Sequence, residues 1–183
     1  MRIISGKARG IKLYSLEGST TRPTLDRVKE SLFNIIQNQV PECTFLDLFS
    51  GSGAIGLEAA SRGAKKTILC EKNKAAISII KKNIEKTHLE DKVKLYENSY
   101  ENLLNTINEK FDIIYIDPPY KTDFAYEATK LILKNNLLNE KGTIIIETDE
   151  EERIIKQIEK LEIEIVNRRR YGRVHLVFLE KWD

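Results

Sequence analysis

The stretch with the clearest chemical potential is Asp117-Pro118-Pro119-Tyr120, which directly follows an apolar run at residues 111–116. Both prolines fix φ and lack an N–H, so the loop is stiff and its carbonyl oxygens can accept hydrogen bonds from a ligand. Asp117 and the Pro118 carbonyl can each accept one hydrogen of an exocyclic amine on a nucleobase, and Asp117 can take the departing proton. Tyr120 can stack on the base once that base is flipped out or unpaired. We therefore predict that Asp117, Pro118 and Tyr120 are catalytic residues acting on such an amine.

A glycine-rich loop at residues 46–56 (LDLFSGSGAIG) is the second candidate site. Its three glycines follow a G-x-G-x-x-G pattern, which permits a tight turn and a close approach of a ligand to the backbone. The pattern alone also fits a dinucleotide-binding protein. Asp47 would repel a pyrophosphate, whereas it would attract the ammonium and sulfonium groups of S-adenosylmethionine. We therefore predict S-adenosylmethionine as the cofactor, bound in this loop by Asp47, Phe49, Gly51 and Gly53.

Two further segments provide candidate contacts to the adenosine part of that cofactor. Glu71 ends the next apolar run, and a carboxylate at this place can accept both hydroxyls of a ribose. Asn98 and Ser99 follow the third apolar run, where comparable folds carry an acidic residue that holds the adenine amino group. We predict Glu71 at the ribose and Asn98 or Ser99, as weaker neutral acceptors, at the adenine.

Other kinds of active site find no support in the sequence. No Pro-Cys pair follows a predicted strand, so nothing points to covalent attack by a cysteine on a pyrimidine carbon. His88 and His175 stand alone, and no metal-ligand spacing occurs, so we expect no metal. Cys43 and Cys70 lie in apolar surroundings and are expected to be buried thiols.

Short apolar runs alternate with helical periods along most of the chain. Strands are predicted at residues 44–49, 67–71, 93–96, 111–117, 143–147, 163–166 and 174–179. Helices are predicted at residues 55–62, 74–86, 100–108, 124–133 and 150–161. This alternation indicates a parallel sheet covered on both faces, and an Arg-rich turn containing Gly172 makes the last strand antiparallel. The predicted fold is α/β, a Rossmann-like class I S-adenosylmethionine-dependent methyltransferase with a mostly parallel seven-stranded sheet.

The N-terminal part carries its own pattern. Residues 2–16 indicate a small hairpin around two glycines, and Pro23 opens a helix that extends to about Gln39. We predict a single domain, in which residues 1–42 form a basic extension and residues 43–183 the Rossmann-like core. The parallel sheet is not expected to need the extension for its own core.

Charge is unevenly distributed, although the net charge of the 183 residues is only +2. Residues 1–34 hold seven basic and three acidic groups, and residues 168–173 hold four arginines, expected on a turn. Residues 123–164 carry eleven acidic and six basic groups. Such asymmetry suggests one basic face that binds a polyanion. The predicted RNA-binding residues are Lys7, Arg9, Arg22, Arg27, Lys29, Arg168 and Arg169.

The chain lacks an apolar run long enough to cross a bilayer, and its first residues lack the apolar core of a secretory signal. We therefore expect a cytoplasmic protein with no membrane partner.

Taken together, these motifs make the chain resemble the RsmD family of bacterial 16S rRNA (guanine-N2)-methyltransferases. The resemblance rests on residues 2–10 (RIISGKARG), 22–34 (RPTLDRVKESLFN), 46–56, 58–64 (EAASRGA), 117–120 (DPPY) and Tyr171-Gly172. It implies methylation of the exocyclic N2 of one guanine in 16S rRNA, within the small ribosomal subunit or its assembly intermediate. It also implies that Asp47, Gly51, Gly53 and Glu71 surround the cofactor and that residues 117–120 meet the base. Members of the family often have Asp where this chain has Ser99.

Three alternatives remain open. The main one is a DNA (or other RNA) adenine-N6 methyltransferase, because Asp-Pro-Pro-Tyr serves any conjugated exocyclic amine; DNA enzymes usually add a recognition domain, for which this chain has no room. The second is an rRNA-binding assembly factor without catalysis, which would be expected to have a broken loop at residues 117–120, and here the loop is intact. The third, a nicotinamide-dependent oxidoreductase, is disfavoured by Asp47.

Overall fold

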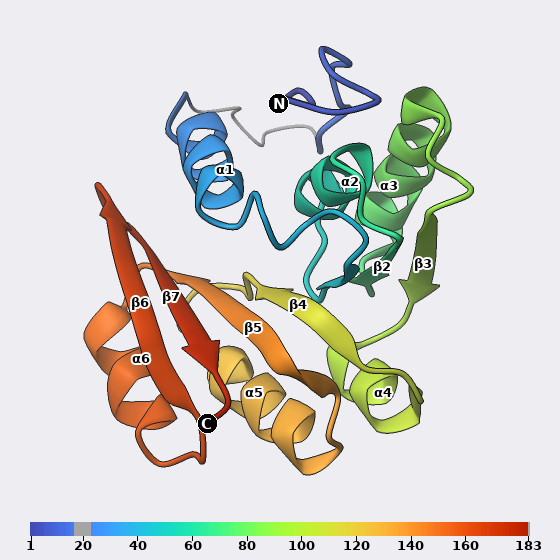
Figure 1. Cartoon of the computed structure of the whole chain (residues 1–183). Coiled ribbons are helices and arrows are strands. Elements are labelled where there is room, and N and C mark those ends of the chain that lie inside the picture. Colours follow the sequence, from blue (N-terminus) through green and yellow to red (C-terminus); the bar gives the residue numbers. More distant parts are fainter. Residues whose placement is uncertain (17–22, 183) are drawn as a thin grey trace.

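The computed structural model describes residues 1–16 and 23–182, and its centre is a seven-stranded sheet flanked by helices (Figure 1). The strands are β1 (Thr44–Asp47), β2 (Lys66–Glu71), β3 (Val93–Glu97), β4 (Phe111–Ile116), β5 (Leu138–Thr148), β6 (Glu164–Tyr171) and β7 (Val174–Glu180). The helices are α1 (Pro23–Ile35), α2 (Ala54–Ser61), α3 (Lys74–Thr87), α4 (Tyr100–Thr106), α5 (Phe124–Lys134) and α6 (Glu151–Ile158).

The strands lie in the order β3-β2-β1-β4-β5-β7-β6. Strands β1 to β5 pair in parallel, whereas β7 pairs antiparallel with both β5 and β6, which confirms the predicted sheet. The chain reverses its direction of growth between the adjacent strands β1 and β4. In open α/β sheets, ligands bind outside the carboxyl ends of the strands at such a switch point.

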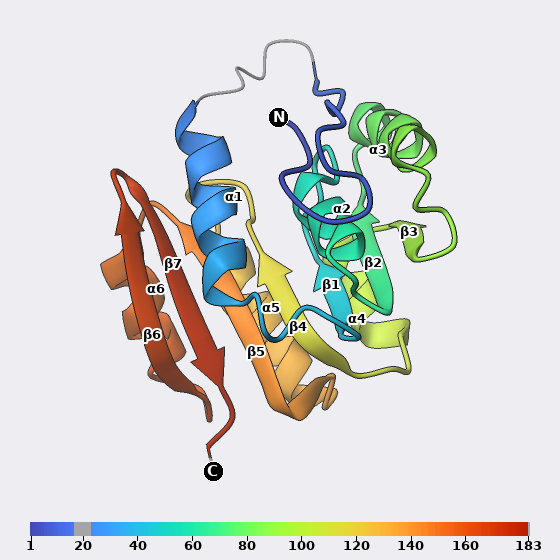
Figure 2. The same ribbon diagram turned by 45° about the horizontal axis from the view of Figure 1, so that its top comes forward.

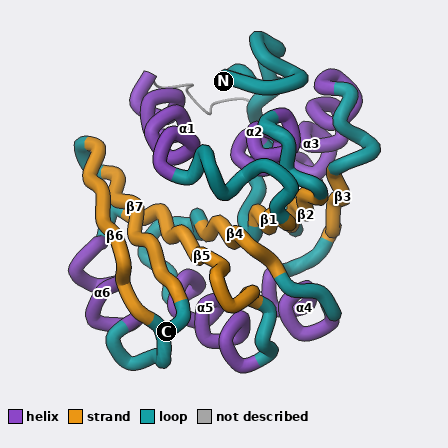
Figure 3. The backbone as a smooth tube through the Cα atoms, in the orientation of Figure 1, coloured by secondary structure: helices purple, strands orange, loops and turns teal. Residues whose placement is uncertain are grey.

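Helices cover both faces of the sheet, with α1, α2 and α3 on one side and α4, α5 and α6 on the other (Figures 1 and 3). Strands buried on both faces read as continuous apolar runs, and this is how residues 111–116 appear in the sequence. Ile114, Ile144 and Val177 pack toward one layer, while Ile113, Ile145 and Phe178 pack toward the other. Because side chains alternate along each strand, the sheet contributes residues to a hydrophobic core on each of its two faces.

Helix α1 forms part of the core, contrary to the expectation that the sheet does not need residues 1–42 for its own core. Val28, Leu32 and Phe33 are buried against residues of β1, β4, β5 and β7, and Figure 2 shows α1 lying across this face. The helix ends at Ile35 rather than near residue 39, although Ile36 remains buried. Because α1 covers a face that would otherwise be apolar and exposed, it belongs to the core.

The segment before α1 is less regular than predicted. The expected hairpin at residues 2–16 is reduced to one antiparallel bridge between Arg2 and Lys12. Ile3 and Ala8 are nevertheless buried against α2. Gly6 has φ +85°, and a Cβ there would lie 1.8 Å from the carbonyl oxygen of Ser61, so the segment can pack this closely only because position 6 is glycine.

Strand β6 is longer than predicted, so Arg168, Arg169 and Arg170 lie within it and the prediction that they occupy a turn is wrong. Cross-strand pairing with β7 continues through Tyr171 and Val174, which leaves only Gly172 and Arg173 for the turn. The extended pairing holds the three arginines in a strand despite their repelling charges.

In the part of the chain that the structure describes, no helix is long and apolar enough to cross a membrane. The same residues contain no group of three or more His, Cys, Asp or Glu side chains placed to hold a metal ion. Cys43 and Cys70 are free and buried, as predicted.

Candidate active site

Three carboxylates gather at the carboxyl edge of the sheet, on the face covered by α1. Asp47 ends β1 opposite Tyr115 of β4, and Tyr115 in turn pairs with Ile145 of β5. Because side chains alternate along a strand, Asp117 shares the face of Tyr115, and Glu147 shares the face of Ile145. Asp47, Tyr115, Asp117 and Glu147 therefore point the same way and line one cavity of about 370 Å3, which Val28 and Lys29 of α1 also line.

Asp47 is deeply placed, with 1% of its surface exposed, and its Oδ2 accepts a hydrogen bond from the Gly56 N–H at 3.0 Å. Burial raises the pKa of Asp47 to about 7, with the Gly56 N–H opposing the shift and the charges of Glu71 and Glu147 adding to it. Burial, followed by the charges of Glu147 and Asp47, raises the pKa of Asp117 well above its usual range.

Glu147 also has a raised pKa because of burial, which the hydroxyl of Tyr115 partly offsets by donating a hydrogen bond to its Oε2. Sequence reasoning missed this residue. Strongly perturbed acids clustered in a cavity are candidates for function, since a fold gains no stability from buried like charges. A cationic ligand in the cavity would favour their ionised forms.

A second cavity, of about 350 Å3, lies beside the first and shares Phe49, Gly51 and Asp117 with it. Gly51 has φ +57°, and a Cβ built on it would meet nothing within 4 Å, so the backbone here faces open space that a ligand can occupy. The two cavities thus lie next to each other over the carboxyl ends of β1, β2 and β4.

Gly53 behaves differently from Gly51. It has φ +82°, lines neither cavity, and a Cβ on it would meet the side chain of Leu69 at 3.3 Å. The second glycine of the pattern thus serves the turn into α2 and the packing beneath it.

Glu71 lines the second cavity and is held rigidly by backbone donors. Its Oε2 accepts from the Gly51 N–H at 2.9 Å, and its Oε1 accepts from the N–H groups of Lys72 and Asn73 at 2.9 and 2.8 Å. Each carboxylate oxygen can accept further hydrogen bonds. Glu71 is therefore preorganised to receive neighbouring hydroxyl groups.

Asn98 and Ser99 line the same cavity, but their side-chain oxygens already accept hydrogen bonds within the protein. The Asn98 Oδ1 accepts from the Ser99 N–H and from Asn102 Nδ2, each at 2.9 Å. The Ser99 Oγ accepts from the Asn102 N–H at 3.2 Å and caps α4. An adenine amino group that donates to either side chain would share an oxygen already used to hold this helix.

Three aromatic rings in mutual contact, those of Phe49, Tyr100 and Phe124, line this cavity. The rings of Phe49 and Phe124 lie with centroids 6.3 Å apart and planes 3° from parallel. Tyr100 lies 5.1 Å from Phe49 and 5.3 Å from Phe124. Of these three rings, only Phe49 was predicted at the site. Phe124 could have been suspected from its position four residues after Tyr120, at the start of a helix. These rings offer a flat apolar surface suited to a planar heterocycle.

The loop at residues 117–120 closes the junction of the two cavities. Asp117 lines both, while Pro118 and Tyr120 line the second. The hydroxyl of Thr122 donates to the Pro119 carbonyl at 2.8 Å, which braces the loop from behind. Tyr120 is 65% exposed, so its ring is accessible at the mouth of the site.

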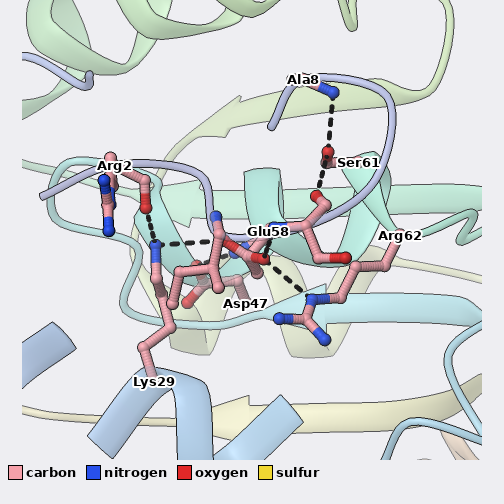
Figure 4. A network of polar contacts seen from close by, with 10 residues as sticks. Arg2, Ala8, Lys29, Asp47, Glu58, Ser61 and Arg62 are labelled. Atoms are coloured by element: carbon pink, nitrogen blue, oxygen red, sulfur yellow. Dashed lines mark hydrogen bonds and ion pairs between the residues drawn. The ribbon is translucent and has the colours of Figure 1, made fainter. Parts of the chain in front are cut away.

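The predicted role of Lys29 in binding RNA is wrong. The side chain of Lys29 is 1% exposed; its Nζ lies 3.1 Å from Glu58 Oε2 and donates to the Arg2 carbonyl (Figure 4). Glu58 also binds Arg62 at 2.8 Å. Lys29 thus ties α1 to α2 and the N-terminal segment, and its charge is already neutralised by Glu58.

The other predicted RNA-binding residues are scattered. The backbone of Lys7 contacts Ser61, the last residue of α2, so Lys7 and its exposed neighbour Arg9 lie at the opposite end of this helix from the glycine-rich loop. Arg27 is exposed on α1, next to the cavity-lining Val28. Arg22 lies outside the described residues.

The arginines of β6 point to both faces of the sheet. Arg168 and Arg170 share a face with His175, which lies 3.2 Å from Glu151 of α6, whereas Arg169 points toward the face of α1. Thr148 at the end of β5 pairs with His175, so the adjacent turn with Arg173 lies at the same edge of the sheet as the two cavities.

Known proteins are similar to this chain over most of its length. The model of the conserved hypothetical protein 95 family matches residues 1–180. The chain is 37% identical to ribosomal RNA small subunit methyltransferase D of Haemophilus influenzae over 158 residues, which cover 85% of this chain and 82% of that protein.

Solved structures show the same fold. The Escherichia coli protein yhhF superposes with a TM-score of 0.83 at 28% identity, and the match covers 100% of this chain and 99% of the yhhF chain. The ribosomal protein L11 methylase of Lactobacillus delbrueckii superposes with a TM-score of 0.70 at 22% identity, over 84% of this chain and 77% of that one. The predicted class I methyltransferase fold is thereby confirmed. The chain belongs to the conserved hypothetical protein 95 family, the RsmD family of methyltransferases.

Proposed function

We propose that the protein transfers a methyl group from S-adenosylmethionine to the exocyclic N2 amine of a guanine in 16S rRNA, in the small ribosomal subunit or its assembly intermediate. The observation that carries the proposal is the position of Asp117. It stands where the two cavities meet, at the head of a braced Asp-Pro-Pro-Tyr loop. A cofactor that extends across the two cavities and a base that enters at this loop would therefore meet beside the same carboxylate.

The residues fit the proposed cofactor. Glu71, fixed by three backbone N–H groups, is placed for the ribose hydroxyls, and the rings of Phe49 and Phe124 for the adenine. Asp47 suits the positive charge of the methionine part. When bound, S-adenosylmethionine would supply an electrophilic methyl group.

The residues of the chain would prepare the amine. Its lone pair is conjugated into the base, so the nitrogen is a poor nucleophile. Asp117 and the Pro118 carbonyl each accept one N–H, which favours a pyramidal nitrogen, and Asp117 then accepts the proton. A carboxylate with a raised pKa is a stronger base than an ordinary aspartate. Tyr120 stacks on the base and holds it in place.

The choice of rRNA rests on the names of relatives such as that of Haemophilus influenzae and on the arginines near the site. The decisive experiment is incubation with labelled S-adenosylmethionine and 16S rRNA, small-subunit particles or DNA, followed by digestion and identification of the methylated nucleoside. We expect N2-methylguanosine from RNA or particles. N6-methyladenine, from DNA or RNA, would replace this proposal by the adenine alternative, and no product from any substrate would leave catalysis unsupported.

Cofactor affinity is expected to depend on Asp47 and Glu71. Removing either charge in Asp47→Asn or Glu71→Gln should cost about 1.5–3 kcal/mol, or roughly ten- to hundredfold in affinity for S-adenosylmethionine. Because Asp47 has a pKa of about 7, wild-type affinity should increase as the pH rises through 7 and the carboxylate ionises. The increase should be shallower in Asp47→Asn and retained in Glu71→Gln. Calorimetry at several pH values tests this; unchanged affinity in both variants would refute the assigned cofactor site.

RNA binding is expected to depend on the arginines near the site rather than on all basic residues. Each phosphate contact contributes about 0.7–0.9 to the slope of log affinity against log salt, so changing Arg27, Arg169 and Arg173 to alanine should lower the slope by up to about 2–3. A Lys7→Ala, Arg9→Ala variant, altered at the far end of α2, is the matched control. RNA affinity measured over a series of salt concentrations distinguishes the two. A larger loss in the control would place the RNA path along the N-terminal segment.

A further inference from the structure

The proposed reaction leaves one carboxylate of the cavity without a role. Asp117 meets the amine and Asp47 suits the cofactor, but Glu147 lines the same cavity on the next strand. Glu147 comes two residues after Ile145, which pairs with Tyr115, so it stands level with Asp117. Neighbouring strands are about 4.8 Å apart, so the two carboxylates lie side by side, close enough to contact adjacent atoms of one planar ligand.

Glu147 is held in place by a neighbour. The hydroxyl of Tyr115, itself 2% exposed, donates a hydrogen bond to its Oε2. Among residues 1–16 and 23–182, no hydrogen bond or ion pair involves Oε1. Glu147 is partly exposed and lines the cavity, so this oxygen is available to accept a hydrogen bond from a ligand there.

The chemistry of the bases determines which ligand matches two neighbouring acceptors. On the Watson–Crick edge of guanine, the N1–H lies directly beside the N2 amine, so two neighbouring nitrogen atoms both donate hydrogen bonds. Adenine presents one amine beside the lone pair of N1. A carboxylate next to that lone pair would be repelled and left without a donor.

We propose that Glu147 accepts the N1–H of the target guanine while Asp117 holds its N2 amine, so that Glu147 selects guanine over bases with an unprotonated N1. This inference rests on the proposed function and names the residue that reads the base. Tyr115 is a positioning residue, because it acts through Glu147. Glu147 takes no proton in the reaction.

The test compares two bases that carry the same 2-amine. An rRNA fragment with the mapped target nucleotide is prepared with guanine or with 2-aminopurine, whose N1 is an acceptor. The wild type should prefer guanine by roughly 100-fold or more in kcat/KM, as a site built for one hydrogen bond rejects an analogue that lacks it. In Glu147→Gln, the amide can donate to N1 of 2-aminopurine, so this preference should fall by about tenfold or more. The loss of the guanine O6 is common to both proteins and cancels in the ratio of preferences.

Two controls make the outcome decisive. Glu140→Gln makes the same change at an exposed site on the same strand and should retain the wild-type preference. Affinity for S-adenosylmethionine should be the same in Glu147→Gln and wild type, since a loss would show that Glu147 serves the cofactor and would overturn the inference. If Glu147→Gln fails to fold, Tyr115→Phe should reduce the preference for guanine in its place.

An unchanged preference in a folded Glu147→Gln variant would also refute the role of Glu147 while leaving guanine methylation intact. Failure of the wild type to methylate guanine both in the fragment and in small-subunit particles would instead refute the proposed function, so the two failures are distinguishable.

Discussion

Replacing Asp117 by alanine is expected to reduce kcat by about two to four orders of magnitude, the usual contribution of a positioned general base. The variant loses both the acceptor for the amine hydrogen and the proton acceptor, and Asp117 is the one carboxylate among the described residues that lines both cavities. Single-turnover measurements with saturating S-adenosylmethionine and rRNA would separate the chemical step from binding.

The controls for Asp117 lie within the same site. Cofactor affinity of Asp117→Ala should remain close to that of wild type, because Glu71 and Asp47 hold the cofactor. Tyr120→Phe should be mild, whereas Tyr120→Ala should lose about 1–3 kcal/mol of stacking on the base. An Asp117→Ala variant that retained most of its rate would exclude Asp117 as the proton acceptor.

Replacing Glu58 by alanine is expected to destabilise the fold by about 3–5 kcal/mol, the cost of breaking a buried ion pair. Glu58 is fully buried and neutralises Lys29, whose pKa burial lowers while Glu58 opposes the shift. It also accepts the N–H groups of Ile4 and Ser5 at 2.9 and 3.0 Å. For a domain of this size, thermal denaturation should show a decrease in Tm of roughly 10 °C.

The matched control is Glu90→Ala, an exposed glutamate, which should change Tm little. Adding Lys29→Met to Glu58→Ala should recover part of the loss, because it removes the unpaired charge. An equal loss in the single and double variants would mean that the orphaned N–H groups of the N-terminal segment, rather than Lys29, cause the instability.

Much of the fold was readable from local patterns. Apolar runs such as residues 111–116 are continuous because parallel strands are buried on both faces, and this leaves a mark in the sequence itself. The limits of α1 and β6 were less readable. Pairing with β7 extends β6 through Arg168 to Arg170, and no local signal predicts that three adjacent arginines lie in a strand.

Part of the site followed from the sequence in the same way. Asp47, Glu71 and Asp117 each end a strand or follow one directly, and the carboxyl ends of parallel strands meet at one edge in any such sheet. Their gathering therefore required no knowledge of side-chain packing. Gly51 was likewise recognisable, because its position in the turn is set by its immediate neighbours.

By itself, the sequence determined the sheet, the edge that carries the site and the acceptors at Asp47, Glu71 and Asp117. Only the tertiary structure distinguished Glu147, as a residue of the site, from the acidic residues that follow it in the sequence. The register of β5 against β4 brings this one carboxylate beside Asp117. The tertiary structure also shows that Lys29 forms a buried ion pair with Glu58 and is not part of an RNA-binding surface. A charge has the same signature in a sequence whether it faces water or a buried partner, and its burial depends on residues far away along the chain.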